Sequence, residues 1–419
     1  MTPSARLQAV VDILQGLDAT AQPADRYVRD FFRARRYAGS KDRAAVAERT
    51  FAVLRHRASF AWRMGSEEAR ALVIASLLAE GLAADAIADL FDGKGYGAAV
   101  LSEAERLAIA SPLSGAAPLY VRGEFPEFLE PELTRAFGPA LLDEMKAMQA
   151  RAPIDLRVNT LKASREAVLE TLRAEGYDAE TTRTSPFGLR IPSGEGSAKL
   201  GATSSFLEGT FEFQDEAAQI AALLCGAKPG MRVLDLAAGA GGKSLALAAI
   251  MQNMGEIVAS DIDSARLEPL IPRARRAGAT IVQPRHAIPD GPFDVVLIDS
   301  PCSGSGTWRR QPELRWRITP ERLKELTALQ DTMLEQGAAH VAPGGRLVYA
   351  TCSLLPAENE DRIAQFLSSH PDFAPVPAVD AWREAVGTEP PAGMDRFFQA
   401  TPRRTGTDGF FTAVLQRAR

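Results

Sequence analysis

The second half of the chain alternates short apolar segments with helical segments, and this pattern constrains the fold more than any other feature. From about Gln214 onward, several segments have the composition of buried strands: Arg232–Leu236, Ile257–Asp261, Thr280–Gln283, Phe293–Asp299 and Gly345–Thr351. Strands that alternate with helices form a parallel sheet with helices on both faces. The sequence therefore predicts an α/β domain, and Phe410–Leu415 is expected to add an antiparallel edge strand.

The rest of the chain differs from this pattern and indicates further domains. Residues 1–112 have apolar positions at helical spacing and predict an all-helical bundle, with one helix starting near Ser40 and Asp42. Residues 113–150 combine a linker containing Pro and Gly with one or two helices. Residues 151–213 mix strands with one helix and predict a small α+β domain, whereas residues 214–419 form the α/β domain.

Composition limits the class of protein. Apolar residues make up 46% of the chain, but no apolar run approaches the roughly 20 residues of a membrane helix, and no signal peptide is visible. Three cysteines without regular spacing favour a reducing cytoplasm over a disulfide framework. The cysteines and the four histidines form no metal-binding cluster in the sequence. We therefore expect a cytoplasmic monomer with no membrane segment and no metal.

Basic residues gather in two stretches, although the net charge is -5. Between Arg26 and Arg57 there are ten Lys and Arg against three Asp and Glu, and several aromatic residues lie among them. A second stretch runs from Arg309 to Lys324. Local basic surface on an acidic chain is typical of proteins that bind nucleic-acid phosphates at selected places. A solvated helix face would give the same pattern.

A turn of small residues follows the first strand of the α/β domain. It comprises Ala237, Ala238, Gly239, Ala240, Gly241, Gly242 and Lys243. Small residues let the backbone approach a ligand closely, and the N-terminus of the following helix favours an anion. Asp261 ends the next strand about 25 residues further on, where an acid commonly holds a ribose. The pattern indicates a nucleoside cofactor.

Other interpretations of this turn are less favoured. A phosphate-binding loop of the GxxxxGK[ST] type requires Gly where this chain has Ala237. A dinucleotide would favour the G-x-G-x-x-G pattern, which is absent here. S-adenosylmethionine is therefore the better candidate, and a tight turn without a ligand is the remaining alternative.

Two of the three cysteines directly follow predicted strands. Cys302 comes after the strand that ends at Asp299, and Cys352 comes after the strand that ends at Thr351. Methylation of cytosine at carbon 5 requires a thiolate that adds to carbon 6, a carboxyl group near ring N3, a base and a cofactor pocket. The two cysteines, Asp299 and the small-residue turn supply this set. These residues alone do not show which cysteine attacks, and Cys225 is predicted to be a buried apolar residue.

The segments around these cysteines resemble motifs of the RsmB/NOL/NSUN family of RNA 5-methylcytosine methyltransferases. Asp299–Thr307, followed by Arg309, Arg310, Arg315 and Trp316, resembles the family's fourth motif. Tyr349–Ser353, with Pro356, Glu358 and Asn359, resembles its sixth motif. Further segments also match the family: Leu156–Leu161, Gln214–Ala217 and Asp408–Phe411. Residues 1–112 resemble the NusB-like RNA-binding domain of the RsmB branch.

This resemblance implies a fold, a cofactor and roles for individual residues. It implies a Rossmann-like class I methyltransferase domain, preceded by a small α+β RNA-binding domain and an all-α NusB-like domain. S-adenosylmethionine would be held by the turn Ala237–Lys243, by Asp261 and by Asp299. Cys352 would attack the base, and Cys302 would assist proton removal and product release. The expected substrate is a cytosine in 16S ribosomal RNA; a transfer RNA substrate, or a non-catalytic RNA-binding assembly factor, is the alternative.

The sequence departs from the family pattern at two places. The family's cofactor turn usually reads Cys-Ala-Ala-Pro-Gly-Gly-Lys, whereas this chain has Ala237, Gly239 and Ala240 at three of these positions. The family usually has an acid after the third strand, but the segment Gln283–Ala287 contains no carboxylate. Cofactor binding is expected to tolerate the small replacements, while the contacts with adenine are expected to differ.

Overall fold

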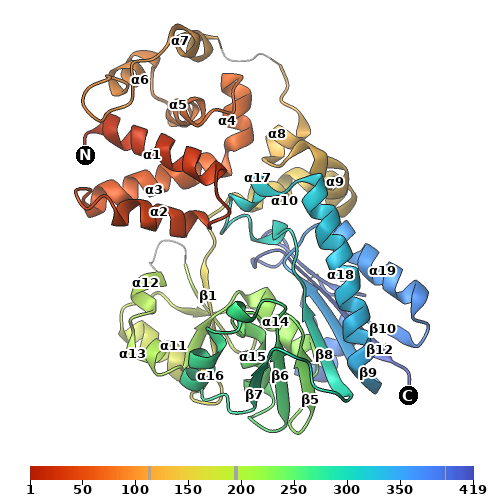
Figure 1. Cartoon of the computed structure of the whole chain (residues 1–419). Helices are drawn as coiled ribbons and strands as arrows, with labels where there is room; N and C mark the ends of the chain where they lie inside the picture. The colour runs from red at the N-terminus through yellow and green to blue at the C-terminus, as the bar shows by residue number, and fades with distance from the viewer. Residues whose placement is uncertain (112–114, 193–196, 392) are drawn as a thin grey trace. The chain divides into compact units, whose positions relative to one another are not determined.

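The chain divides into two compact units (Figure 1). The computed structural model describes residues 1–111, 115–192, 197–391 and 393–419. The first unit comprises Met1–Gln149 and Trp308–Ile318, and the second comprises Ala150–Thr307 and Thr319–Arg419. Residues 112–114, which span the predicted boundary between the helical bundle and the linker, lie outside the described residues. The segment Trp308–Ile318 belongs to the helical unit, whereas its position in the sequence is within the predicted α/β domain.

The first unit is built from helices, in agreement with the helical spacing of its apolar residues. Its helices are α1 (Pro3–Asp18), α2 (Ala24–Arg33), α3 (Ser40–Arg55), α4 (Arg57–Met64), α5 (Ala69–Ala79), α6 (Ala84–Leu90), α7 (Glu103–Ala110), α8 (Leu119–Gly123), α9 (Glu130–Phe137), α10 (Leu141–Ala147) and α17 (Leu314–Arg317). Helix α5 is buried along most of its length because its residues are almost all apolar. Helix α3 begins at Ser40, and Asp42 accepts a hydrogen bond from the Gly39 amide at its start.

The segment Trp308–Ile318 is held in the core of the helical unit by hydrogen bonds. The Trp316 indole N–H donates to the Leu54 carbonyl over 2.7 Å. The buried Glu313 accepts a hydrogen bond from the Ala24 amide over 2.9 Å. These contacts join residues far apart in the sequence, so local pattern alone does not predict them.

Several arginines of the second basic stretch are buried, and the prediction of a basic surface is wrong for them. Arg309 is 5% exposed and Arg315 is 0% exposed. Arg315 lies over the Trp308 ring, and burial lowers the pKa of Arg315 to about 10. Arg317 donates to backbone carbonyls, including that of Gln22 over 3.0 Å. These arginines therefore make contacts within the helical unit and do not form a basic surface.

A small antiparallel sheet begins the second unit. Its strands have the order β2-β3-β1-β4, and they are β1 (Ile154–Val158), β2 (Glu180–Thr181), β3 (Gly188–Ile191) and β4 (Phe211–Phe213). Helix α11 (Arg165–Ala174) packs its apolar side chains on this sheet, and the short helices α12 (Ser197–Leu200) and α13 (Ser204–Leu207) precede β4. Asp155 on β1 forms an ion pair with Arg190 on β3 over 2.6 Å. The predicted mixed unit is present, with both strands and a helix.

A sheet of eight strands forms the centre of the second unit. Seven of its strands follow one path, in the order β10-β12-β9-β8-β5-β6-β7, and β11 pairs separately with β12. The strands are β5 (Arg232–Asp235), β6 (Glu256–Ser260), β7 (Val282–Arg285), β8 (Phe293–Asp299), β9 (Val341–Thr351), β10 (Phe373–Val376), β11 (Phe398–Ala400) and β12 (Phe410–Arg417). Strands β5 to β9 are parallel, which confirms the predicted α/β fold.

The prediction that Phe410–Leu415 forms an edge strand is wrong. Strand β12 is antiparallel, as expected, but it lies between β9 on one side and β10 and β11 on the other. Its residues are buried from Phe410 to Leu415 because both faces and both edges are covered. The additional strands β10 and β11 have only four and three residues, and β10 contains a proline. Their sequences therefore give only a weak indication of a strand.

Helices cover both faces of the large sheet (Figure 1), and alternate residues of its strands pack in the two cores between sheet and helices. Val295 and Leu297 of β8 pack in one core with α14 (Glu216–Leu224), α15 (Gly242–Ile250), α16 (Leu270–Ala277) and α20 (Ala378–Val386). Val296 and Ile298 pack in the opposite core with α18 (Pro320–His340) and α19 (Glu360–Ser369). Both faces of the strand are apolar because both are buried. Among the residues that the structure describes, no helix is long and apolar enough to span a membrane.

The order of the parallel strands reverses between β5 and β8. From β5 the chain proceeds outward to β6 and β7, and it then returns to place β8 and β9 on the other side of β5. Ligands of open α/β sheets bind beyond the carboxyl ends of strands at such a point. The turn after β5 and the loops after β8 and β9 therefore share one edge of the sheet.

Replacing Glu313 by Ala is expected to destabilise the helical unit by about 1–3 kcal/mol, because the buried Ala24 amide would lose its acceptor. Denaturant unfolding followed by tryptophan fluorescence measures this change. Glu313→Gln is the matched control, since its carbonyl oxygen can still accept the hydrogen bond. Equal stability of the wild type and the Ala variant would contradict the structural role of this contact.

Candidate active site

The turn between β5 and α15 contains most of the predicted cofactor residues. Ala237, Ala238, Gly239, Ala240 and Gly241 form the turn, and Gly242 and Lys243 begin α15. Gly239 and Gly241 have φ angles of 50° and 81°, which fall in the left-handed region that favours glycine. A Cβ atom on Gly241 would also lie 2.0 Å from a methyl carbon of Leu270. Glycine at position 241 is therefore required by the backbone and by packing.

Asp261 lies at the end of β6, beside this turn. One of its carboxylate oxygens accepts a hydrogen bond from the Gly239 amide, and the other accepts from the Asp263 amide, both over 3.0 Å. The half-exposed Arg266 lies 3.4 Å from the first oxygen. Each carboxylate oxygen has two lone pairs, so Asp261 retains acceptor capacity. The arrangement fits a ribose hydroxyl that takes the place of the Arg266 guanidinium.

Ile262 is a candidate cofactor contact that the sequence analysis did not identify. It follows Asp261 directly, and 91% of its surface is exposed. A large apolar side chain in this position fits the face of a purine ring. The sequence feature that could have identified Ile262 is a large apolar residue directly after the acidic residue at the end of a strand.

Two arginines from outside the turn hold its carbonyl groups. Arg157 on β1 donates to the Gly242 carbonyl over 2.6 Å, and burial lowers the pKa of Arg157 to about 10. Arg273 on α16 donates to the Ala240 carbonyl over 2.6 Å and forms an ion pair with the buried Glu212 of β4 over 2.9 Å. The small sheet therefore supports the conformation of the turn.

A buried carboxyl group lies at the base of the turn. Asp235, the last residue of β5, accepts a hydrogen bond from the Ser244 hydroxyl over 2.6 Å. Burial raises the pKa of Asp235 to about 7. The hydrogen bond joins the end of β5 to the first turn of α15. Asp235 therefore has a structural role.

Asp299 and Lys243 form an ion pair at this edge of the sheet. The Lys243 ammonium lies 2.6 Å from the Asp299 carboxylate, and their side chains are 8% and 37% exposed. The ammonium also lies 5.0 Å from the centre of the Phe410 ring. The structure thus brings together Lys243, which was predicted to bind the cofactor, and Asp299, which was predicted to lie near the target base.

The two cysteines that follow strands are in direct contact. The sulfur atoms of Cys302 and Cys352 lie 3.4 Å apart, although the residues are separated by 50 positions. Parallel pairing of β8 with β9 aligns Asp299 with Ala350 and continues through the hydrogen bond from the Ser300 amide to the Ala350 carbonyl. The Gly306 amide in turn donates to the Cys352 carbonyl over 2.9 Å. Backbone pairing therefore brings the two cysteine loops side by side.

The three cysteines differ in their surroundings. The hydrogen bond with Cys352, followed by burial, raises the pKa of the Cys302 thiol well above its ordinary value. Cys225 is fully buried, as predicted, and burial raises the pKa of its thiol to about 12. Cys225 packs in the apolar core of the second unit, so it is a structural residue.

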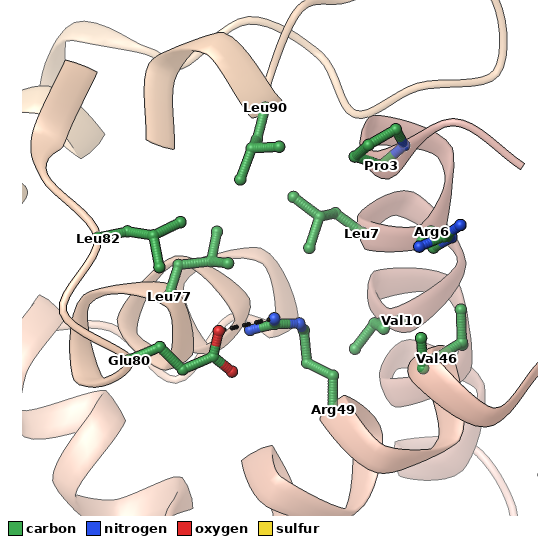
Figure 2. A pocket seen from close by; sticks show the side chains of 11 residues that line it. Pro3, Arg6, Leu7, Val10, Val46, Arg49, Leu77, Glu80, Leu82 and Leu90 are labelled. Carbon is green, nitrogen blue, oxygen red and sulfur yellow. Dashed lines mark hydrogen bonds and ion pairs between the residues drawn. The ribbon is translucent and has the colours of Figure 1, made fainter. Parts of the chain in front are cut away.

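Figure 2 shows a pocket in the helical unit that contains none of the predicted site residues. Its lining is mainly apolar, and the side chains of Arg49 and Glu80 form an ion pair there over 2.9 Å. The structure also has no group of three or more His, Cys, Asp or Glu side chains arranged to hold a metal, as far as its described residues extend. The candidate site is therefore the edge of the sheet that carries the turn, the ion pair and the two thiols.

Two family models match the second unit and the segment before it. The model described as 16S rRNA methyltransferase RsmB/F matches residues 222–416, which include β5 to β11 and all of β12 except its last residue. The model described as the RsmF/B-like ferredoxin-like domain matches residues 125–195. These ranges contain the candidate site and most of the small antiparallel sheet.

Individual proteins show the same similarity. The chain is 34% identical to a probable ribosomal RNA small subunit methyltransferase B of Synechocystis over 70% of this chain and 67% of that protein. It is 30% identical to the corresponding Bacillus subtilis protein over 70% of this chain and 66% of that protein, so the similarity spans about two thirds of both relatives. The crystal structure of PH0851 is 26% identical, with a TM-score of 0.76, and covers 100% of this chain and 99% of that one.

Removing Cys352 is expected to make Cys302 more reactive toward an alkylating agent at mildly alkaline pH. The thiolate is the reactive form, and contact with Cys352 is the main cause of the raised pKa of Cys302. In Cys352→Ala the pKa of Cys302 should fall, so its alkylation should begin at a lower pH. Peptide mass spectrometry after iodoacetamide treatment across a pH series measures each cysteine separately.

Cys225→Ala is the matched control because its thiol lies in the apolar core, away from the pair. An identical pH dependence of Cys302 alkylation in the wild type and Cys352→Ala would contradict the coupling of the two thiols.

Proposed function

We propose that this chain, which belongs to the 16S rRNA methyltransferase RsmB/F family, methylates carbon 5 of a cytosine in small-subunit ribosomal RNA. S-adenosylmethionine is the cofactor of this methyltransferase family. The observation that carries the proposal is the 3.4 Å contact between the thiols of Cys302 and Cys352 at the carboxyl ends of adjacent strands. Both thiols share a sheet edge with the turn after β5.

Cys352 is proposed to attack carbon 6 of the cytosine. This addition makes carbon 5 nucleophilic, and S-adenosylmethionine supplies the methyl group to it. The raised pKa of Cys302 supports this division of roles, because a higher pKa lowers the fraction of the thiolate, which is the nucleophilic form of a cysteine. The family resemblance assigns the attacking role to the same residue, Cys352.

Cys302 is proposed to assist the last step. After methylation, carbon 5 carries both the methyl group and its original proton. The Cys302 thiol can protonate the departing Cys352 sulfur, and the Cys302 thiolate formed in this way can accept the carbon-5 proton, so that the double bond is restored as the bond from carbon 6 to sulfur breaks. The Cys302 sulfur lies 3.4 Å from the sulfur that leaves. This distance supports a role in moving a proton near the departing thiolate.

The ion pair of Asp299 and Lys243 is proposed to stabilise charge on the base. Thiolate addition at carbon 6 develops negative charge at ring N3. Asp299 holds the Lys243 ammonium at this sheet edge, and the positive charge of the ammonium can compensate the charge on the ring. The turn from Ala237 to Lys243 and Asp261 are proposed to hold the cofactor. Asp261 fits a ribose hydroxyl, and the exposed Ile262 fits the adenine.

The N-terminal helices are proposed to bind RNA, as the resemblance to a NusB-like domain implies. On α2, the side chains of Arg26, Arg29 and Arg33 are 70%, 65% and 74% exposed. Tyr37, which follows α2, is 72% exposed and could stack on a base. The target cytosine must leave its stack, which costs a few kcal/mol and is least costly in a loop.

Two alternatives are separated by direct measurements. A non-catalytic RNA-binding factor is favoured only by the absence of a carboxylate in the segment Gln283–Ala287. Calorimetry with S-adenosylmethionine decides this point, because such a factor would show no binding. Bisulfite sequencing of total RNA from a deletion strain distinguishes a ribosomal substrate from a transfer RNA substrate.

Cys352→Ala is expected to abolish methylation because Cys352 is the thiol proposed to form the adduct with carbon 6. Cys302→Ala is expected to retain the covalent complex, since release of Cys352 would be slow. A denaturing gel with labelled RNA shows the trapped adduct, and transfer of a labelled methyl group measures turnover. Cys225→Ala is the control, and normal turnover by Cys352→Ala would refute the proposed mechanism.

Asp261→Asn is expected to weaken S-adenosylmethionine binding about tenfold or more, because a hydrogen bond to a charged acceptor is lost. Titration calorimetry measures the dissociation constant. Asp263→Asn is the matched control, since the Asp263 side chain accepts from the Ala265 amide in a local turn. Equal affinity of the wild type and Asp261→Asn would contradict the proposed ribose contact.

A further inference from the structure

Glu358 is a fully buried carboxylate that contacts both cysteine loops. It ends the short 3-10 helix Pro356–Glu358 and is 0% exposed. One of its oxygens accepts from the Ser303 amide over 2.8 Å and from the Gln330 side chain over 3.1 Å. The other accepts from the hydroxyl groups of Ser303 and Ser353, each over 2.5 Å. Four donors thus converge on one carboxylate.

These contacts fix the residue directly after each cysteine of the pair. Ser303 follows Cys302, and Ser353 follows Cys352. A carboxylate offers two oxygens with about four acceptor sites, which matches the four donors present. An amide of the same size would offer one acceptor oxygen. The number of donors therefore explains why Glu occupies this position.

The backbone around Glu358 is itself anchored. The Tyr349 hydroxyl group on β9 donates to the Glu358 carbonyl over 2.7 Å. Gln330 on α18, besides its contact with the carboxylate, donates to the Pro301 carbonyl over 2.9 Å. A rigid support of this kind allows the carboxylate to determine where the two loops lie.

We propose that Glu358 is a positioning residue for the two-cysteine site: it ties the Cys302 loop to the Cys352 loop and holds the two thiols in contact. This inference rests on the proposed covalent reaction, which needs both thiols beside one base. The charge of Glu358 adds a second effect, because it contributes, after the Cys352 contact and burial, to the raised pKa of Cys302. The negative charge of Glu358 thereby disfavours the thiolate form of Cys302.

The test compares wild-type full-length protein with Glu358→Asp and Glu358→Gln. Aspartate keeps the charge but is one methylene shorter, so it cannot reach the donors of both loops. Glutamine keeps the shape but removes the charge. Glu358→Asp is expected to lower kcat about 100-fold, the effect of a misplacement near 1 Å, with little change in KM for S-adenosylmethionine. Because a smaller fraction of folded enzyme would also lower the apparent kcat at constant KM, kcat is calculated per folded molecule.

A second measurement needs neither RNA nor cofactor. Iodoacetamide alkylation of Cys302 across a pH series is expected to shift to lower pH in both variants. Aspartate separates the thiols, glutamine removes the opposing charge, and either change lowers the pKa of Cys302. Glu216→Gln is the matched control, because Glu216 is also 0% exposed and accepts from the Thr184 and Ser185 amides away from the cysteine pair. Thermal unfolding of all variants shows which of them are folded.

A folded Glu358→Asp variant with wild-type kcat, or with an unchanged Cys302 alkylation profile, would overturn the positioning role. Failure of the proposed function is a different result, namely wild-type protein that methylates no cytosine in RNA. In that case the alkylation profiles still decide whether Glu358 holds the thiols together.

Discussion

The parallel pairing of β8 with β9 is the constraint on which the candidate site depends. Each strand is followed by a loop that contains a cysteine, and the pairing from Val295–Arg346 to Asp299–Ala350 brings these loops to the same sheet edge. A shift of one residue would turn alternate side chains to the opposite core. Because both cores are apolar and filled, the register is strongly specified, and the sulfur atoms come to lie 3.4 Å apart.

Buried polar groups then refine the geometry that the sheet provides. Glu358 collects hydrogen bonds from both cysteine loops, and Arg157 and Arg273 hold the carbonyl groups of the turn after β5. Such groups would be costly to bury without partners. Their bonds favour one arrangement of the loops over others that would pack equally well, which is the precision that a reaction at one carbon atom requires.

The sequence predicted the parallel strands, the turn and the buried state of Cys225, because each is encoded by neighbouring residues. It missed the central position of β12, since an antiparallel strand has the same local pattern at an edge and inside a sheet. It also assigned Arg315 to a basic surface, although this residue is 0% exposed. A charged residue is usually predicted to be exposed, but long-range contacts can bury it. For Arg315 these contacts are with the Trp308 ring and the Arg55 carbonyl.

The sequence by itself determined the fold class and the residue types available for the reaction. The features that did so are the strand periodicity, the small residues where the backbone must turn, and the two cysteines that follow strands. These features are local, so one chain segment is enough to reveal each of them. Only the tertiary structure decided which side chains meet. It joined Cys302 to Cys352, Lys243 to Asp299, and both cysteine loops to Glu358. Such contacts depend on strand order and register, which are set by the packing of the whole sheet.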